Sequence, residues 1–300
     1  MKNKFILDFL ETIEYYKRHF VNPETYVQKV FKKRMGYNLD LNNPRTFNEK
    51  LQWMKLYDHN PLYTTLVDKY EVKQYVADKL GSQYIIPTLG VWECVDDIDF
   101  NSLPNQYVLK CTHDSGGLVI CKDKSKLNVT RAKRVLRKGL KRNFYYMGFE
   151  WPYKNVKPRI IAEEYMEDSK TKELRDYKFF CFDGEVKALF IATERQKEGE
   201  DVKFDFFDAD FNHLPFRQGH ENAPVLPEKP LRFEDMKVLA AKLSKGIPQV
   251  RVDFYEVDGR VFFGEMTFFH HGGWTPFDPQ EWDKKWGEWI ILPRQIYKNK

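Results

Sequence analysis

Residues 249–267 read QVRVDFYEVDGRVFFGEMT, and this stretch decides how the second half of the chain folds. It holds two β-like runs, and the pair Asp258-Gly259 between them is a hairpin turn signal. We therefore predict two antiparallel strands, Gln249–Tyr255 and Arg260–Phe268, joined by a tight turn.

Four polar side chains of this hairpin are candidates for chemistry. Alternate residues of a strand share a face, so Arg251 lies beside Asp253, and Glu265 lies beside Thr267. Strand pairing then brings two carboxylates close to one arginine. In a half-buried sheet such an arrangement needs a cation, and hard oxygen ligands favour Mg²⁺ held together with substrate phosphates. The alternative is an exposed polar face with a salt bridge.

Outward from this hairpin, further β-like runs alternate with turns. They are Tyr107–Cys111, Leu118–Cys121, Arg159–Tyr165, Tyr177–Phe182 and Val186–Ala192. Asp183-Gly184 is a second hairpin signal. Because hairpins rather than β-α-β units connect most strands, we predict an α+β fold with antiparallel sheets and helices packed against them.

Helical patterns fill the rest of the chain. Thr46 and Glu49 form a capping box that begins a helix, and a second helix is expected over Tyr63–Leu80, with Gly81 in left-handed cap geometry. Helices are also expected at Thr130–Arg142 and Phe233–Lys245. The first 42 residues are predicted to form a helical arm, Phe5–Phe20 and Glu24–Met35, that either packs on the body or contacts a membrane surface.

Composition excludes several classes of protein. With 300 residues and 42% hydrophobic content, the chain can bury a sizeable core, which excludes a disordered tail. The formal net charge of +5 falls short of a dedicated nucleic-acid binder. Its 4 cysteines lack metal or disulfide spacing, and no apolar run reaches membrane-spanning length. We expect no signal peptide and a cytoplasmic location.

Two further segments carry candidate binding residues. Lys110 ends a strand and is followed by a small polar loop with paired glycines, Thr112–Gly117, whose backbone can approach phosphates. Ile160–Met166 is an apolar strand that runs into two acids, and it can present backbone groups and one carboxylate to an adenine edge. By itself the first segment is more often an ordinary hairpin, and the second is equally consistent with a plain sheet edge.

Together these pieces resemble the ATP-grasp superfamily, specifically its TupA-like branch from teichuronopeptide and capsular polysaccharide synthesis. The resemblance runs from about Asn43 to Pro293. The matching positions follow the family's order: Asn43–Trp53, Asp68-Lys69 with Lys73, Gly81, and Ile86-Pro87. It implies two α+β lobes that grip ATP, with an N-terminal helical region at 43–104, a small lobe at 105–165 and a C-terminal lobe at 166–300.

The resemblance also implies roles for individual residues. Lys69 and Lys110 are the phosphate-binding lysines, and Lys178 is a further ATP contact. The glycine-rich lid is formed by His113, Ser115, Gly116 and Gly117, and the adenine-binding hinge by Glu163 and Met166. Mg²⁺ is held by Asp253 and Glu265, while Arg251 faces the transferred phosphoryl group; Thr267 stands where the family has asparagine.

The implied activity is that of a ligase that phosphorylates a carboxylate and lets an amine attack the acyl phosphate. The carboxylate is expected on a uronic-acid saccharide, or on its nucleotide- or lipid-linked precursor, and the amine on an amino acid or amino sugar. A kinase of a sugar hydroxyl and a non-catalytic nucleotide-binding protein are the alternatives. Residues 122–142 hold ten basic side chains against Asp123. This charge excess either attracts polyanions and anionic headgroups, including those of the inner membrane face, or is an ordinary solvated face.

Overall fold

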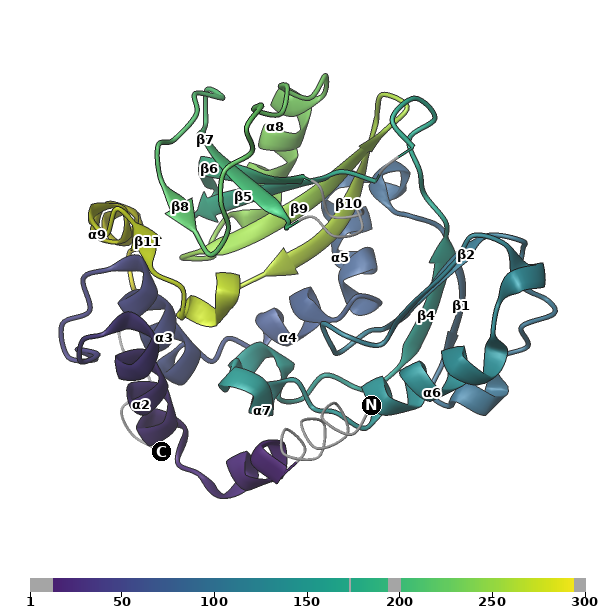
Figure 1. Cartoon of the computed structure of the whole chain (residues 1–300), viewed down its shortest axis with the longest axis horizontal. Helices are drawn as coiled ribbons and strands as arrows, with labels where there is room; N and C mark the ends of the chain where they lie inside the picture. The colour runs from purple at the N-terminus through teal and green to yellow at the C-terminus, as the bar shows by residue number, and fades with distance from the viewer. Residues whose placement is uncertain (1–12, 173, 194–200, 294–300) are drawn as a thin grey trace.

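The computed structural model describes residues 13–172, 174–193 and 201–293 of the chain. The fold is built on two main antiparallel sheets, and helices pack around them (Figure 1). The strands outside the two main sheets are β8 (Arg217–Gln218) and β11 (Phe277–Asp278), which pair with each other. Short 3-10 turns lie at Arg18–Phe20, Ser82–Tyr84, Val95–Asp97, Lys124–Lys126, Trp151–Tyr153 and His270–Gly273.

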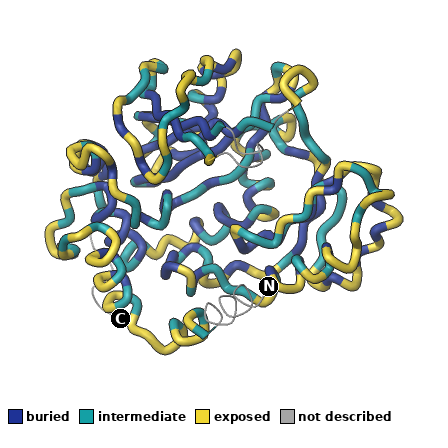
Figure 2. The backbone as a smooth tube through the Cα atoms, viewed as in Figure 1, coloured by how far each residue is buried: buried dark blue, intermediate teal, exposed yellow. Residues whose placement is uncertain are grey.

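The larger sheet has five strands in the order β10-β9-β5-β6-β7. Its strands are β5 (Asp176–Phe182), β6 (Glu185–Thr193), β7 (Lys203–Asp208), β9 (Val250–Val257) and β10 (Arg260–Thr267). Every residue of the central strand β5 is buried, because helices cover the sheet on both faces (Figure 2). Helix α8 (Phe233–Ser244) packs on one face through Phe233 and Leu243. Strand β7 was not expected from the sequence.

The smaller sheet has four strands in the order β1-β4-β2-β3. They are β1 (Thr88–Trp92), β2 (Tyr107–Cys111), β3 (Leu118–Cys121) and β4 (Ile160–Glu164). Helix α6 (Val129–Leu140) closes a separate small core with Ala132 and Leu136. Strand β1 was also not expected, and it lies before residue 105, where the sequence predicts that the small lobe begins.

Helices α2 (Pro23–Met35) and α3 (Phe47–Tyr57) begin as predicted, whereas the segment after them is divided into two helices, α4 (Leu62–Val67) and α5 (Glu71–Leu80). Later in the chain come α7 (Tyr145–Gly148) and α9 (Glu281–Trp289). The capping box of Thr46 and Glu49 is confirmed. The Thr46 side chain accepts the backbone N–H of Glu49, and the Glu49 side chain accepts the backbone N–H of Thr46. In the described part of the arm, Arg18 donates to the Tyr146 carbonyl at 3.2 Å, so this part packs on the body.

The single helix predicted over Tyr63–Leu80 is wrong. Asp68 interrupts it, because its carboxylate accepts the backbone N–H of Tyr70 at 2.9 Å and thereby starts a new helix, α5. Gly81 ends α5 with φ 109° and ψ 152°, which is not the left-handed cap that we expected. The break places Lys69 between two helix ends. No helix in the described ranges is long and apolar enough to span a membrane.

Helices α3 and α9 meet at Asp283, a fully buried acid. Its Oδ1 accepts the Asn48 backbone N–H at 2.9 Å, a donor at the start of α3 that has no partner within the helix. Its Oδ2 is buried without a hydrogen-bond partner among the described residues. Burial is the main cause that raises the pKa of Asp283 from 3.8 to about 6.

This raised pKa predicts a pH-dependent stability. The folded state binds the Asp283 proton more tightly than the unfolded chain, so the free energy of unfolding falls as pH rises through the window from about 4 to 6. Asp283→Asn keeps an acceptor for Asn48 and removes this dependence. From urea unfolding, the stability of the variant relative to the wild type should therefore increase by about 2 to 3 kcal/mol between pH 4 and 7.

Asp235→Asn, on the exposed face of α8, is the matched control and should show no such trend. A stability difference for Asp283→Asn that does not change with pH would contradict the assignment.

Candidate active site

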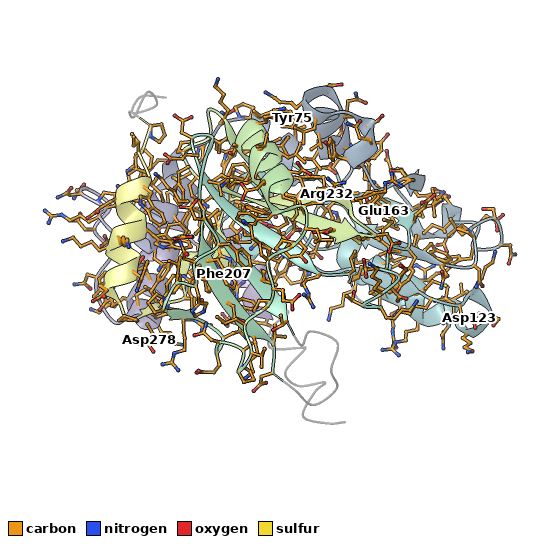
Figure 3. All side chains as sticks on the ribbon, turned by 90° about the horizontal axis from the view of Figure 1, so that it is seen from above. Tyr75, Asp123, Glu163, Phe207, Arg232 and Asp278 are labelled. Carbon is orange, nitrogen blue, oxygen red and sulfur yellow. The ribbon has the colours of Figure 1, made fainter. Side chains whose placement is uncertain are left out.

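A cavity of about 540 Å³ lies between the two sheets. Both sheets contribute to its lining: Lys110, Leu118, Ile120 and Glu163 come from the small one, and Asp176, Lys178, Thr193 and Glu265 from the large one. Glu163 lies near the centre of the molecule, whereas Asp123 lies at the outer end of the small lobe (Figure 3). A cavity of this size fits a small-molecule ligand.

One wall of the cavity is apolar. Leu118 and Ile120 on the edge strand β3 are 50% and 53% exposed, and they line the cavity together with Val108, Met166 and Leu174. Large apolar side chains in a concave site favour a flat ring, because the ring covers surface that water otherwise contacts. Met166 therefore belongs to the apolar wall, and its role in an adenine-binding hinge stays a prediction.

The rest of the lining is strongly charged. Six basic and five acidic side chains line the cavity. Two of the acids, Asp114 and Glu163, are paired with Arg142 and Lys73, which do not belong to the lining. One of the lining cations, Lys122, is likewise paired with an acid outside the lining, Glu167. The cavity therefore carries a positive excess, as a site for an anionic group requires.

Glu163 does not offer a free carboxylate to the cavity. It is 5% exposed, and its two oxygens contact Lys73 at 2.5 Å and Lys110 at 2.6 Å. Burial alone raises the pKa of Glu163, but the two lysines outweigh burial, and the net shift is downward. The carboxylate thus fixes the ammonium group of Lys110, a function that the sequence did not indicate.

Lys69 connects the break between α4 and α5 to the loop after β2. Its ammonium donates to the Asp114 carbonyl at 2.8 Å, and its backbone N–H donates to the Thr112 carbonyl at 3.1 Å. Lys69, Asp114, Ser115 and Gly116 line the cavity. Of the four residues predicted for the lid, Ser115 and Gly116 therefore line the cavity together with Lys69.

Two residues of the predicted lid do not line the cavity. His113 is 2% exposed, and burial lowers its pKa. A Cβ at Gly117 would lie 2.5 Å from the Cys111 sulfur, so this glycine allows close packing of the loop. Arg142, at the end of α6, donates to both carboxylate oxygens of Asp114, at 2.7 and 2.6 Å. The sequence did not reveal that α6 fixes this loop.

The carboxylate centre is built across three neighbouring strands. The register places Lys178 of β5 opposite Asp253 of β9, and Asp253 opposite Glu265 of β10. The extra residue Gly264 forms a bulge in β10, which turns Glu265 to the same face as Asp253. A glycine inside a strand is the sequence signal for such a bulge. Without the bulge, strict alternation would place Glu265 on the face of the sheet opposite to Asp253.

Arg251 organises this centre. The residue is 8% exposed, and its guanidinium donates to both oxygens of Asp253 at 2.7 Å. It also donates to Glu265 Oε1 at 3.1 Å and to Thr267 Oγ1 at 3.0 Å. Its remaining amino group meets His270 Nδ1 at 3.0 Å, a contact that sequence reasoning did not predict. The four predicted residues therefore do converge.

Glu265 is the open member of the centre. Its side chain is 41% exposed, and it lines the cavity. Burial of the residue acts to raise its pKa, but nearby cations outweigh burial and hold the pKa at about 2. The cations are Lys178, Lys69, Arg251 and Lys110. An ionised carboxylate thus faces the cavity beside several fixed positive charges.

The family model described as TupA-like ATPgrasp matches residues 49–291. The chain belongs to this family. The resemblance predicted from sequence is confirmed, and with it the ATP-grasp fold of two α+β lobes preceded by helices. The domain boundaries at 42, 104 and 165 stay a prediction. None of the curated proteins matches this ATP-grasp chain.

Several solved structures are similar to the chain. The D-alanine–D-alanine ligase from Bacillus anthracis complexed with ATP is 14% identical over 70% of this chain and 57% of its own, with a TM-score of 0.43. The ATP-grasp ligase PsnB complexed with minimal precursor is 11% identical over 73% and 60%, with a TM-score of 0.41. The D-cycloserine synthetase DcsG is 18% identical over 69% of this chain and 64% of its own, with a TM-score of 0.37. The chain spans about 60% of the length of these ligases.

Within the carboxylate centre, Glu265 is the residue that is suited to bind magnesium. Its open, ionised carboxylate is the hard oxygen ligand that Mg²⁺ prefers. Asp253 is fully buried, and Lys178 and Arg251 already donate to its oxygens. Thr267 is a hydrogen-bond acceptor for Arg251. No group of three or more His, Cys, Asp or Glu in the described ranges converges on a metal position, so magnesium would need phosphate ligands as well.

The two cavity lysines should control nucleotide affinity. Lys69→Ala and Lys110→Ala each remove a cation from phosphates in a partly dry cleft, where a charged hydrogen bond contributes about 1.5 to 3 kcal/mol. Calorimetry should show ATP affinity reduced about tenfold to hundredfold in each variant. Lys79→Ala, on the exposed face of neighbouring α5, removes the same charge outside the cavity and should leave affinity unchanged. Unchanged affinity in both cavity variants would exclude this cavity as the ATP site.

Glu265 and Thr267 should differ in their effect on magnesium. Glu265→Gln removes the open charged ligand, so the Mg²⁺ concentration that half-saturates ATP binding should rise about tenfold or more. Thr267→Val removes only a hydroxyl that serves Arg251, and the same concentration should change less than about threefold. ATP titrations over a range of Mg²⁺ concentrations measure both. A larger effect of Thr267→Val than of Glu265→Gln would reverse the assignment.

Proposed function

We propose that this protein is an ATP-dependent carboxylate–amine ligase. The observation that carries the proposal is that Glu265, which accepts a hydrogen bond from Arg251, lines the same cavity as Lys69, Lys110 and Lys178. ATP would place its base against Leu118, Ile120 and Met166, and its phosphates toward Lys69, Lys110 and Lys178. Magnesium, when bound by Glu265 and the phosphates, supplies charge neutralisation for phosphoryl transfer.

The protein's own groups suit each later step. Transfer of the terminal phosphoryl group to a substrate carboxylate forms an acyl phosphate and ADP. An amine then attacks the acyl carbon, forms the amide bond and releases free phosphate. Arg251 is held by Asp253 with one amino group directed toward Glu265, so it can stabilise negative charge on the reacting acyl group. No side-chain nucleophile is required.

The family supports a setting in cell-surface polysaccharide synthesis. We propose that the carboxylate belongs to a uronic acid of a capsule-type saccharide or its nucleotide- or lipid-linked precursor. The amine would come from an amino acid or amino sugar. We place the enzyme in the cytoplasm, with peripheral contact to the inner membrane face through basic residues.

The reaction type can be tested with hydroxylamine in place of the natural amine. With ATP, Mg²⁺ and a panel of uronic acids, the ligase should yield a hydroxamate and one ADP and one free phosphate per product. Arg251→Ala should abolish hydroxamate and phosphate release together while ATP still binds, because this arginine contacts the reacting groups rather than the base. Mass analysis, phosphate release and calorimetry measure these outputs.

Arg260→Ala is the matched control, because Arg260 is an exposed arginine of the same hairpin. It should keep full activity. A stable phosphate ester on a sugar hydroxyl, formed without any hydroxamate, would replace the ligase with a kinase. Loss of the fold in Arg251→Ala is checked by thermal unfolding, and Arg251→Lys, which keeps the charge, then serves as the test.

A further inference from the structure

Helix α6 carries four cations in a line. Arg131, Arg134, Lys138 and Lys141 follow one another at spacings of three, four and three residues, which places them on one face of a helix. All four are exposed. In the part of the chain that the structure describes, no acidic side chain pairs with any of them. We call these four residues the α6 stripe.

The other cations at this helix have acidic partners, although Lys133 and Arg137 share a single carboxylate. Lys133 and Arg137 both contact Asp96, at 3.1 and 2.6 Å. Arg142 is paired with Asp114 at 2.6 Å. The positive excess that the sequence shows over 122–142 is therefore concentrated in the stripe rather than spread around the helix.

The opposite face of α6 is used for packing. Ala132, Leu136 and Gly139 are buried against the small sheet and its following loop. The helix therefore has no free apolar face to insert into a bilayer, as interfacial helices do. The segment 129–142 also contains no aromatic residue on which a nucleic-acid base can stack. A line of charges about 15 Å long, at 1.5 Å per residue, remains as its exposed feature.

The stripe leads to the cavity. Lys141 directly precedes Arg142, and Arg142 holds Asp114 of the loop that lines the cavity. The loop and the helix are in close contact, because a Cβ at Gly139 would lie 3.1 Å from Gly117 Cα. A chain bound along the stripe would thus end beside the loop that covers the proposed phosphate position.

We propose that the α6 stripe is a docking site for a linear polyanion with a carboxylate on successive units. Regularly spaced cations on one helix face match a polymer with regularly spaced charges, and each contact adds a modest, salt-sensitive term. The stripe itself indicates a polyanion, and the proposal rests on the proposed function for the choice of carboxylate units and for the further step, in which the docked polymer presents a unit to the cavity. Binding itself requires neither ATP nor turnover.

The test compares two quadruple variants with the same loss of charge. One replaces the stripe with glutamine (R131Q/R134Q/K138Q/K141Q), and the other replaces exposed cations of α2 (K29Q/K32Q/K33Q/R34Q). Glutamine preserves helix propensity in both. Fluorescence anisotropy with labelled polygalacturonate at 50 and 200 mM NaCl, without ATP, measures binding, and dextran is the neutral control.

Wild type and the α2 variant should bind polygalacturonate within about threefold of each other. The stripe variant should lose at least about tenfold in affinity and most of the salt dependence. Equal losses in both variants would overturn the proposal, because they would show unspecific charge attraction. It would also be overturned if the wild type bound phosphatidylglycerol vesicles or duplex DNA more tightly than polygalacturonate and the stripe variant lost that binding.

This outcome is separate from the test of the proposed function. Ligase activity on a monomeric uronic acid does not need the stripe, so failure to dock leaves the hydroxamate result intact. Conversely, stripe-dependent binding without any hydroxamate would sustain the docking site and exclude the ligase.

Discussion

The buried guanidinium of Arg251 is the group on which the site depends. It lies in the interior of a five-stranded sheet, where an unpaired charge is strongly unfavourable, and Asp253 pairs with it through two parallel hydrogen bonds. Removing one member of such a buried pair typically costs about 3 to 5 kcal/mol. The planar guanidinium has further donors, and these reach Glu265, Thr267 and His270. The arginine thus fixes at once the orientation of two strands and of the loop that follows them.

The same pair explains which acid is free for a ligand. Asp253 is surrounded by Arg251 and Lys178, so its charge is satisfied within the protein. Glu265 receives a single, longer contact from Arg251 and remains open to the cavity. A similar division holds on the small lobe, where Glu163 is enclosed by two lysines and serves to hold Lys110. In both lobes a buried acid positions a cation that faces the cavity.

Helix α6 has two functions in this arrangement. Its inner face forms the small core and supports the loop after β2, and Arg142 at its end holds Asp114. Its outer face displays cations that no described acid neutralises. A helix whose apolar face is fully used for packing can carry such charge on its other face without a loss of stability, because water solvates the charges there.

The sequence by itself determined the fold class and most of the larger elements. The α+β class, the hairpin of β9 and β10, the capping box at Thr46 and the identity of Arg251, Asp253 and Glu265 follow from local patterns, because turn signals, alternation and caps act between near neighbours. Strands β1 and β7 escaped prediction although both hold β-branched or aromatic residues, because each is short and its pairing with a distant strand decides its conformation. The break at Asp68 was missed because its cap replaces a helical hydrogen bond that periodicity alone predicts.

Only the tertiary structure decided how these residues are partnered. That Glu163 holds two lysines, that Arg142 fixes Asp114, and that His270 meets Arg251 are contacts between segments far apart in the chain. The bulge at Gly264 turns Glu265 toward Asp253, and the partners of α6 select which of its cations stay free. Such contacts depend on packing distances of a few ångströms. Residue spacing along a sequence contains no information about them, because it describes neighbours in the chain and not neighbours in space.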